Sequence, residues 1–258
     1  MRISGKFTVM KKSLIILSIL CFLLPAADAQ LWKLHRLEVS GGIGTTQFFG
    51  DIGGYSNSKN ILGIRDFTFL QTRFDINGNI RYRIAEDISV RFNLVSGLFR
   101  ATDARGSNES RGFESSTIFL EPSVIGEYYF IKNKEENSFV FMNDNVTLLK
   151  SFLKSLDFYA FAGFGGLAYK VTPNSILAPH VTSSGGFTEV VPVGIGVSMI
   201  YNSKINFGIE LGGRFTYSDG IDGYASPKST ANDVYHILNF TVTYKIKSKE
   251  KGLPFSRK

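Results

Sequence analysis

Metal binding and hydrolysis need particular side chains at particular spacings, and this chain offers few of them. Its three histidines are His35, His180 and His236, and no H-x-x-x-H or E-x-x-H spacing is present. Zinc sites commonly use such spacings, so no metal site is predicted. Asp219 and Asp222 in SDGIDG lie three positions apart rather than at the alternate positions of an EF-hand loop, which favours a turn.

Two glycine-rich segments resemble phosphate-binding loops only superficially. They are GGIGTT at 41–46 and GFGGLAYK at 163–170. Neither has the G-x-x-x-x-G-K-[ST] spacing or a helix signal after it, so glycines within strands are the better interpretation. The sequence predicts no cofactor. It also predicts no nucleic-acid partner, because the net charge of +7 is modest and dispersed.

The elements that position the charged residues are strands. The stretch Arg73–Ile84 reads RFDINGNIRYRI and alternates apolar and polar residues without a break. Successive side chains of a strand point to opposite faces, so one face is apolar and the other is charged. In a soluble sheet the charged face meets water, whereas in a membrane barrel the charged face lies inside.

Eight segments show this alternation. They are 37–48, 73–84, 88–99, 117–130, 156–171, 188–200, 205–217 and 238–244. Most have about the 9–11 residues that a tilted strand needs to cross a bilayer. The connections 85–87 and 201–204 are short, whereas 50–70, 101–114, 172–187 and 218–233 are long and polar. Short turns at one end and long loops at the other are typical of outer-membrane barrels.

The fold predicted from this pattern is all-β: an eight-stranded antiparallel up-and-down transmembrane β-barrel with a charge-paired, plugged lumen. Eight strands leave an interior just wide enough for side chains, and enclosed charges must be paired because a desolvated lone charge is costly. The predicted lumen charges are Arg73, Asp75, Arg81, Arg83, Arg91, Glu121, Glu127, Glu210 and Arg214. The predicted lipid-facing residues are Phe74, Ile76, Ile80, Phe92, Leu94, Phe207, Ile209, Leu211 and Phe240.

A soluble β-sandwich or sealed soluble barrel is the alternative fold. Its core would consist of Phe, Tyr and Ile alternating with many glycines. Glycine fits the bends and close strand approaches of a barrel better than it fits the core of a soluble sandwich. Aromatic residues make up 14% of the chain, and the aromatic girdles of a membrane barrel account for such a content. The membrane barrel is therefore the preferred interpretation.

The N-terminal segment predicts export from the cytoplasm. Residues 1–29 have a basic start, a short apolar run and the small-residue site Ala27–Ala29, as expected of a signal peptide. The only cysteine, Cys21, lies in this leader. The predicted organisation is a signal peptide at 1–29, a barrel at 30–247 and a basic periplasmic tail at 248–258, with both termini of the mature chain in the periplasm.

The connection 131–155 is predicted on the periplasmic side and is too long for a turn. It contains NVTLLKSFLKSL, whose apolar residues recur at helical spacing. An amphipathic helix there would present Leu149, Phe152 and Leu153 to a partner or to the inner leaflet, or it would cap the barrel mouth. The sequence leaves these alternatives open.

Six segments, in order, resemble a family of small outer-membrane barrels from Bacteroidota whose best-known member is PorG of the type IX secretion system. The segments are 38–54, 73–84, 119–130, 158–175, 191–225 and 232–247. The family pattern includes a first strand that ends in a GD loop and a penultimate strand that runs into a TDY-D loop. Here the latter reads YSDGIDGYA, in which Asp219 and Asp222 match and Gly220 replaces the usual aromatic residue.

This resemblance implies an eight-stranded barrel in outer-membrane lipids, and contact with a periplasmic ring formed by a lipoprotein and its partner. It supplies no catalytic residues. We therefore expect a non-enzymatic scaffold of an envelope complex. The alternatives are a surface-facing binding or adhesion barrel that uses its long loops and, third, a hydrolase with Ser, Asp and His180 at the extracellular rim.

Overall fold

The computed structural model describes residues 35–53, 68–104, 108–133, 137–142, 148–227 and 232–247. The predicted leader 1–29, the tail 248–258 and most of the loop 50–70 lie outside these ranges. All eight predicted strands lie within them. Two short helices and two single 3-10 turns complete the described regular structure.

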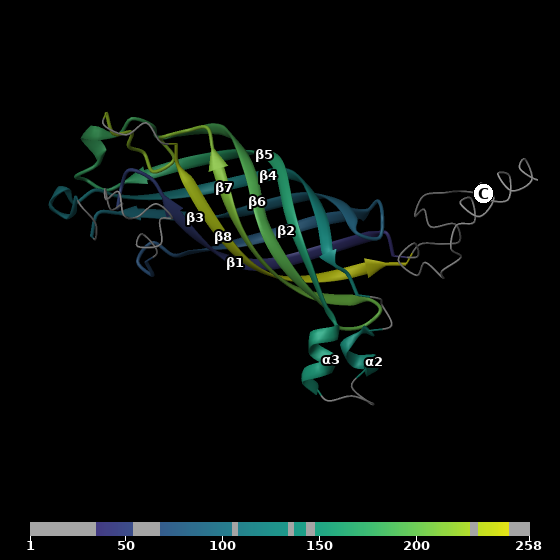
Figure 1. Ribbon diagram of the computed structural model, residues 1–258. Helices are drawn as coiled ribbons and strands as arrows, with labels where there is room; N and C mark the ends of the chain where they lie inside the picture. The colour runs from purple at the N-terminus through teal and green to yellow at the C-terminus, as the bar shows by residue number, and fades with distance from the viewer. Residues whose placement is uncertain are drawn as a thin grey trace, which may run out of the picture.

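The eight strands form one closed barrel in the order of the sequence (Figure 1). They are β1 (Leu37–Phe49), β2 (Arg73–Arg83), β3 (Ile88–Thr102), β4 (Glu114–Ile131), β5 (Leu156–Pro173), β6 (Gly185–Ile200), β7 (Ile205–Thr216) and β8 (Val234–Ile246). Every neighbouring pair is antiparallel, and β1 pairs with β8 from Leu37–Ile246 to Phe49–Val234 to close the ring. Closure leaves no free sheet edge. The predicted fold class is confirmed.

The two ends of the barrel differ. The end that carries the long connections 50–72, 103–113, 174–184 and 217–233 is called here the loop end, at the left of Figure 1. The other end, the turn end, carries the tight turns 84–87 and 201–204, the connection 132–155 and the described ends of the chain. Strands β3 to β6 continue two or three residues further toward the loop end than the alternation predicts, because strand pairing continues where the wall becomes polar.

The connection between β4 and β5 contains α2 (Phe139–Met142) and α3 (Leu148–Lys154) at the turn end (Figure 1). The backbone N–H of Val140 donates to the carbonyl of Tyr201 in the β6–β7 turn at 3.1 Å. The 3-10 turns η3 (Glu109–Arg111) and η5 (Ala178–His180) lie in loops at the loop end. In the described part of the chain, no helix is long and apolar enough to cross a membrane.

Glycines in β6 make room for aromatic rings inside the barrel. A Cβ atom at Gly196 would lie 2.2 Å from the ring of Tyr159, and one at Gly194 would lie 2.5 Å from the ring of Phe161. Both rings are almost fully buried. The glycine-rich composition of this strand is therefore a packing requirement, because each inward ring on β5 lies against a strand position that has no side chain.

Candidate functional site

The outer wall of the barrel is a continuous apolar belt. All nine predicted lipid-facing residues point outward, and their exposed fractions run from 41% for Phe207 to 79% for Phe74. Their neighbours on the wall are also exposed and apolar, among them Ile43, Ile118, Val124 and Ile195. Monomeric soluble proteins rarely expose an apolar patch of more than a few hundred Å². This belt is the surface that bilayer hydrocarbon covers.

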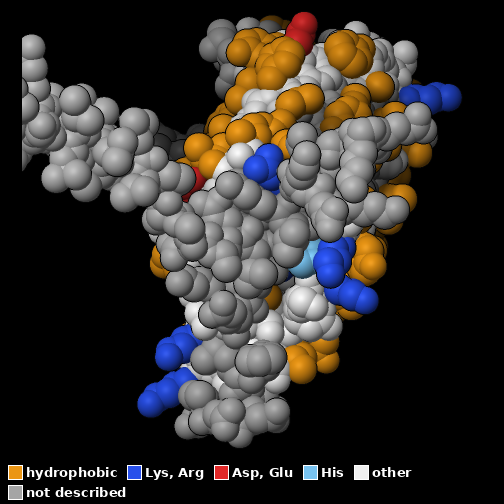
Figure 2. All heavy atoms as spheres, turned by 90° about the vertical axis from the view of Figure 1, so that its right-hand side faces the viewer, with side chains coloured by type: hydrophobic (Ala, Val, Ile, Leu, Met, Phe, Trp, Pro, Cys, Tyr) orange, Lys and Arg blue, Asp and Glu red, His pale blue; other side chains and the backbone are white. Residues whose placement is uncertain are grey.

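The belt has recognisable limits at both ends. Toward the loop end, the outward positions become charged at Arg100, Glu114, Lys170 and Glu189. Toward the turn end, exposed aromatic residues such as Tyr128 line the wall, as in the interfacial girdles of membrane barrels. Figure 2 looks at the turn end and shows hydrophobic side chains gathered along the outer wall at the top and right of the view.

The turn-end half of the lumen holds ion pairs excluded from water. The guanidinium of Arg81 lies 3.1 Å from Glu38 and 2.7 Å from Glu127, and that of Arg83 lies 2.8 Å from Glu38. All four side chains are at most 5% exposed. Charge-assisted hydrogen bonds of this length are the strong ones in proteins, so Glu38 and Glu127 hold these two arginines inside the barrel.

Arg91 bridges two buried carboxylates, those of Glu210 and Glu127. Its guanidinium binds Glu210 through two nitrogens, with Nη2 to Oε2 at 2.7 Å, and lies 3.1 Å from Glu127. The hydroxyl of Tyr159 donates to Glu210 at 2.6 Å, and that of Tyr129 donates to Glu127 at 3.2 Å. Both carboxylates thus have several partners, as a buried charge requires if it is not to destabilise the fold.

A further buried ion pair, Arg214 with Glu121, lies nearer the loop end. Arg214 Nε is 3.4 Å from Glu121, and the hydroxyl of Tyr235 donates to Glu121 at 2.6 Å. The guanidinium groups of Arg214 and Arg91 lie 5.8 Å and 5.3 Å, respectively, from the ring centre of Phe161. We call Glu38, Arg81, Arg83, Arg91, Glu121, Glu127, Glu210 and Arg214 the lumen charge network.

Two predicted lumen charges do not join this network. Arg73 is only partly buried at the start of β2, where its Nη1 donates to the carbonyls of Leu70 and Thr72. It lies at the barrel mouth, so it needs no buried acid. Asp75 points inward and is 3% exposed, but it forms no ion pair with any residue in the described ranges. Arg214, which interacts with Asp75 electrostatically, forms its ion pair with Glu121.

Several interior residues were missed by the sequence interpretation. Glu38 accepts from two arginines, Lys132 pairs with Asp157, and Lys245 is 1% exposed inside the wall. The same alternation that identified the other charges would have found Glu38 and Lys245, because both occupy the inward register of β1 and β8. Asp157 follows the same rule at the start of β5.

The loop-end half of the lumen is filled by an apolar cluster that was not predicted, called here the loop-end plug. Its members are Phe48, Ile52, Val95, Phe99, Ala101, Phe113, Phe119, Leu167, Leu177, Val190, Ile221, Tyr235 and Ile237. The rings of Phe99 and Phe119 stack with centroids 4.1 Å apart. Ile52, Leu177 and Ile221 come from loops, so the loops fold back into the mouth of the barrel and close it.

Aspartates fix these loops to one another. Asp222 accepts the backbone N–H of Ile52 at 3.0 Å, and Asp51 accepts that of Ser226 at 2.6 Å, so the first and last loops bind each other. Asp103 accepts the N–H of Gly53 at 2.9 Å and binds Arg111 at 2.7 Å. The GD and SDGIDG segments thus join loops that are far apart in the sequence.

The carboxyl groups of Asp222 and of a further aspartate, Asp233, lie close together in a buried site. A Cβ atom at Gly50 would lie 2.5 Å from Asp233 Oδ1 and 2.7 Å from Asp222 Oδ2. Burial, and then the neighbouring carboxyl of Asp222, raises the pKa of Asp233 to about 9. Burial also raises the pKa of Asp222 to about 7, with Asp51 and Asp219 adding to the effect. The pair therefore retains a proton near neutral pH.

We expect Asp233→Asn to protect the loop end at high pH. A raised pKa in the folded state means that the closed loops bind a proton that the open loops release, so their stability falls as pH rises from about 4 through the raised values. Amide hydrogen exchange of residues 219–226 at pH 9 should slow about tenfold, equivalent to about 1.4 kcal/mol. Asp103→Asn, which weakens the bond to Arg111, should accelerate exchange instead. Equal exchange rates in wild type and Asp233→Asn would contradict the assignment.

The predicted chemistry-bearing residues are not brought together. His180 is exposed on η5 with its ring 5.4 Å from that of Phe113. Within the described ranges, no hydrogen bond joins its side chain to a serine or aspartate. His236 lies on the outer wall with its ring 5.1 Å from that of Phe49. The described residues contain no group of three or more His, Cys, Asp or Glu side chains arranged to hold a metal ion.

The comparisons with known proteins give structural likeness at low identity. No protein-family model and no curated protein matches this chain. The chain is similar to the N-terminal β-barrel domain of Pseudomonas aeruginosa OprF, with 11% identity over 82% of this chain and 98% of that one, and a TM-score of 0.43. The barrel architecture itself follows from the strand pairing of this chain.

Two further solved structures have similar values. Yersinia pestis Ail, described in complex with the heparin analogue sucrose octasulfate, has 11% identity over 81% of this chain and 97% of that one, with a TM-score of 0.43. The outer membrane enzyme PagL has 12% identity over 81% of this chain and 99% of that one, with a TM-score of 0.32.

Proposed function

We propose that this protein is a non-enzymatic barrel of the bacterial outer membrane that anchors an envelope complex, and that this complex is the type IX secretion machinery. The observation that carries the anchoring role is the solid interior. The lumen charge network and the loop-end plug together occupy both halves of the barrel. A barrel filled in this way holds a position in the membrane and offers its ends to other molecules.

The outer membrane is the location that best fits the wall and the leader. Closed barrels with an apolar exterior are the form in which strands cross a bilayer, and the predicted signal peptide directs the chain out of the cytoplasm. Small bacterial barrels carry short turns in the periplasm and longer loops outside the cell. The turn end then faces the periplasm, together with both termini of the mature chain.

The link to type IX secretion rests on the resemblance of six segments to the PorG-containing family. The turn end supports it with the connection 132–155, which is far longer than a turn requires and is fastened to the β6–β7 turn through Val140 and Tyr201. The rings of Phe139 and Tyr201 stack at 6.4 Å between centroids. This connection is the proposed contact with the ring lipoprotein and its partner, together with the basic tail 248–258, which the sequence assigns to the periplasm.

Replacing residues 134–154 by a short turn should abolish partner binding and leave the barrel folded. The strands on either side pair through Tyr129–Tyr159 and Ile131–Phe158, so the wall does not depend on the connection. We would purify the tagged protein and this variant from detergent-solubilised outer membranes and identify the proteins bound to each. Ring proteins should accompany wild type near stoichiometrically and be lost from the variant.

Two results of this purification would contradict the proposal. If both proteins are clean monomers in the outer membrane, the anchoring role is wrong, and ligand binding by the loops becomes the better hypothesis. If ring proteins bind both forms equally, the connection is not their contact. Replacement of the exposed loop residues Ser175 and Ile176 serves as the control, because they lie at the opposite end of the barrel.

A further inference from the structure

Helix α3 presents two different faces. Leu148, Leu149 and Leu153 are between 56% and 65% exposed, and Phe152 is 41% exposed. At 100° per residue these four side chains form a single stripe along the helix. Ser151, on another side of the helix, is fully buried. The helix therefore packs against the protein through a small polar residue and leaves its apolar stripe uncovered within the described structure.

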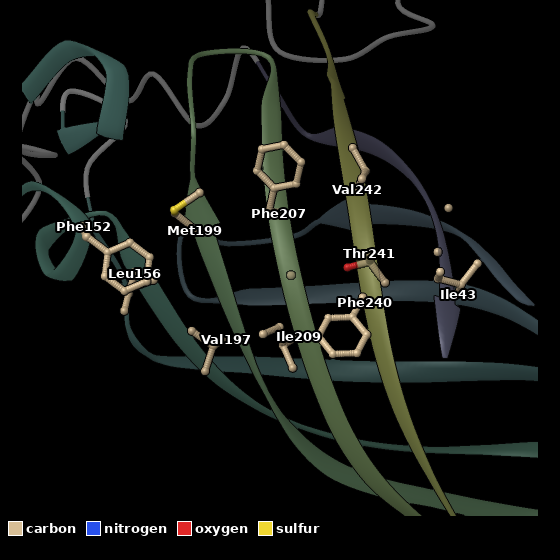
Figure 3. Close-up of a pocket in the computed structure, with 13 residues that line it drawn as sticks. Ile43, Phe152, Leu156, Val197, Met199, Phe207, Ile209, Phe240, Thr241 and Val242 are labelled. Carbon is tan, nitrogen blue, oxygen red and sulfur yellow. The ribbon is translucent and has the colours of Figure 1, made fainter. Parts of the chain in front are cut away.

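The apolar stripe is continuous with the lipid-facing wall. Phe152 and Leu156 line a groove of about 700 Å³ together with Val197, Met199 and Phe207 from β6 and β7 (Figure 3). Figure 3 shows Phe152 beside Leu156 at one edge of this groove, with Ile209 and Phe240 of the wall further along it. The groove lies on the outside of the barrel, so α3 extends the belt and does not close the lumen.

The charges of α3 lie away from this stripe. Lys150 and Lys154 fall on the helix side opposite the apolar stripe, and Lys150 is exposed. Figure 2 shows Lys and Arg side chains projecting in the lower part of the view, at the height of α2 and α3 in Figure 1. A short helix with leucines on one side and lysines on the other suits the boundary between acyl chains and headgroup phosphates.

We propose that α3 is an interfacial membrane helix, whose Leu148, Leu149, Phe152 and Leu153 side chains insert into the lipid leaflet at the turn end while Lys150 and Lys154 contact lipid phosphates. The occupant of the uncovered stripe is lipid because the stripe continues a wall that lipid already covers. The exposed aromatic residues Tyr128 of β4 and Tyr201 of the β6–β7 turn lie toward the turn end, as aromatic residues do where a membrane meets water.

This inference rests on the membrane barrel and is independent of the type IX role. It assigns Leu149, Phe152 and Leu153, the partner contacts expected from the sequence, to lipid. The lysine side of α3 and the rest of the connection then remain accessible for binding to a periplasmic protein. Lipid insertion of α3 would also hold the connection at a fixed height above the membrane, where such a partner meets it.

Single cysteines test the proposal in the purified barrel without any partner. The chain variants carry Cys21→Ser and one of Leu153→Cys, Leu149→Cys, Lys150→Cys or Ile209→Cys, each labelled with an environment-sensitive fluorophore. The proteins are folded into vesicles of phosphatidylethanolamine and phosphatidylglycerol. Quenching by iodide on both sides of the membrane is compared with quenching by spin-labelled lipid.

Labels at 149, 153 and 209 should be quenched by spin-labelled lipid and should be at least fivefold less sensitive to iodide than the label at 150. Equal iodide quenching at 149, 150 and 153, with 209 still protected, would overturn the lipid assignment and return the stripe to a protein partner. Iodide quenching at 209 as well would overturn the membrane barrel itself. Loss of ring proteins in the purification described above has no bearing on these readings.

Discussion

Glu127→Ala should destabilise the folded barrel by about 3–5 kcal/mol, the usual cost of removing one partner from a buried ion pair. Glu127 lies 2.7 Å from Arg81 and 3.1 Å from Arg91, and it accepts the hydroxyl of Tyr129. Without it, two buried guanidinium groups share the remaining carboxylates of the network. Urea titration of the barrel in lipid vesicles, followed by the mobility shift of folded protein on cold gels, measures the loss.

Glu114→Ala on the same strand is the matched control. Glu114 pairs with Arg100 beyond the belt, where the two side chains are 40% and 33% exposed, and exposed pairs contribute at most about 1 kcal/mol. Both variants remove a glutamate carboxylate from β4, but the carboxylate of Glu127 is buried whereas that of Glu114 is exposed. If Glu127→Ala unfolds at the same urea concentration as Glu114→Ala, the carboxylate of Glu127 is hydrated and the lumen is not sealed.

Ile209→Arg should cost about 2–4 kcal/mol, as expected for an arginine on the lipid face near the bilayer midplane. Ile209 is 49% exposed in the middle of β7, between Val197 of β6 and Phe240 of β8. In a soluble protein, an arginine at a half-exposed surface position is tolerated with little change. The same vesicle titration therefore distinguishes lipid from water at this position.

Phe187→Arg controls for the change of residue type. Phe187 is 69% exposed and points outward near the loop end of β6, two positions from the exposed Glu189. Substitution by arginine near an interface costs about 0–1 kcal/mol. Equal losses for Ile209→Arg and Phe187→Arg would mean that the belt has no hydrophobic midplane, and the lipid face would be assigned wrongly.

The wall of this barrel could be predicted from the sequence because each strand carries its own signal. In 73–84 every second residue is apolar, and the structure places Phe74, Ile76 and Ile80 outward and Asn77 and Asn79 inward. Pairing each of these strands with its neighbours in the sequence then gives one closed antiparallel ring. Strand ends were less predictable, because pairing at the loop end continues through polar residues such as Ser115 and Ser116.

The pairing of charges across the lumen could not be predicted, because it depends on the relative height of strands that are distant in the sequence. Asp75 and Arg81 lie on the same strand and share the inward face, yet of the two only Arg81 forms ion pairs among the described residues. The loop-end plug was missed for a related reason. Ile52, Leu177 and Ile221 sit in loops whose polar composition suggests solvent exposure, and only their convergence at the mouth shows that they are buried.

Electrical recording across a planar lipid bilayer shows whether this protein is a membrane barrel with a filled interior. The protein is delivered to the bilayer from lipid vesicles, and its folding in these vesicles is verified first by its mobility on cold gels. The lumen charge network and the loop-end plug predict no current steps above the bare bilayer in symmetric 1 M salt, with or without applied voltage. Stable, reproducible conductance steps from the inserted protein would show an open path through the lumen, and the interior would then not be filled.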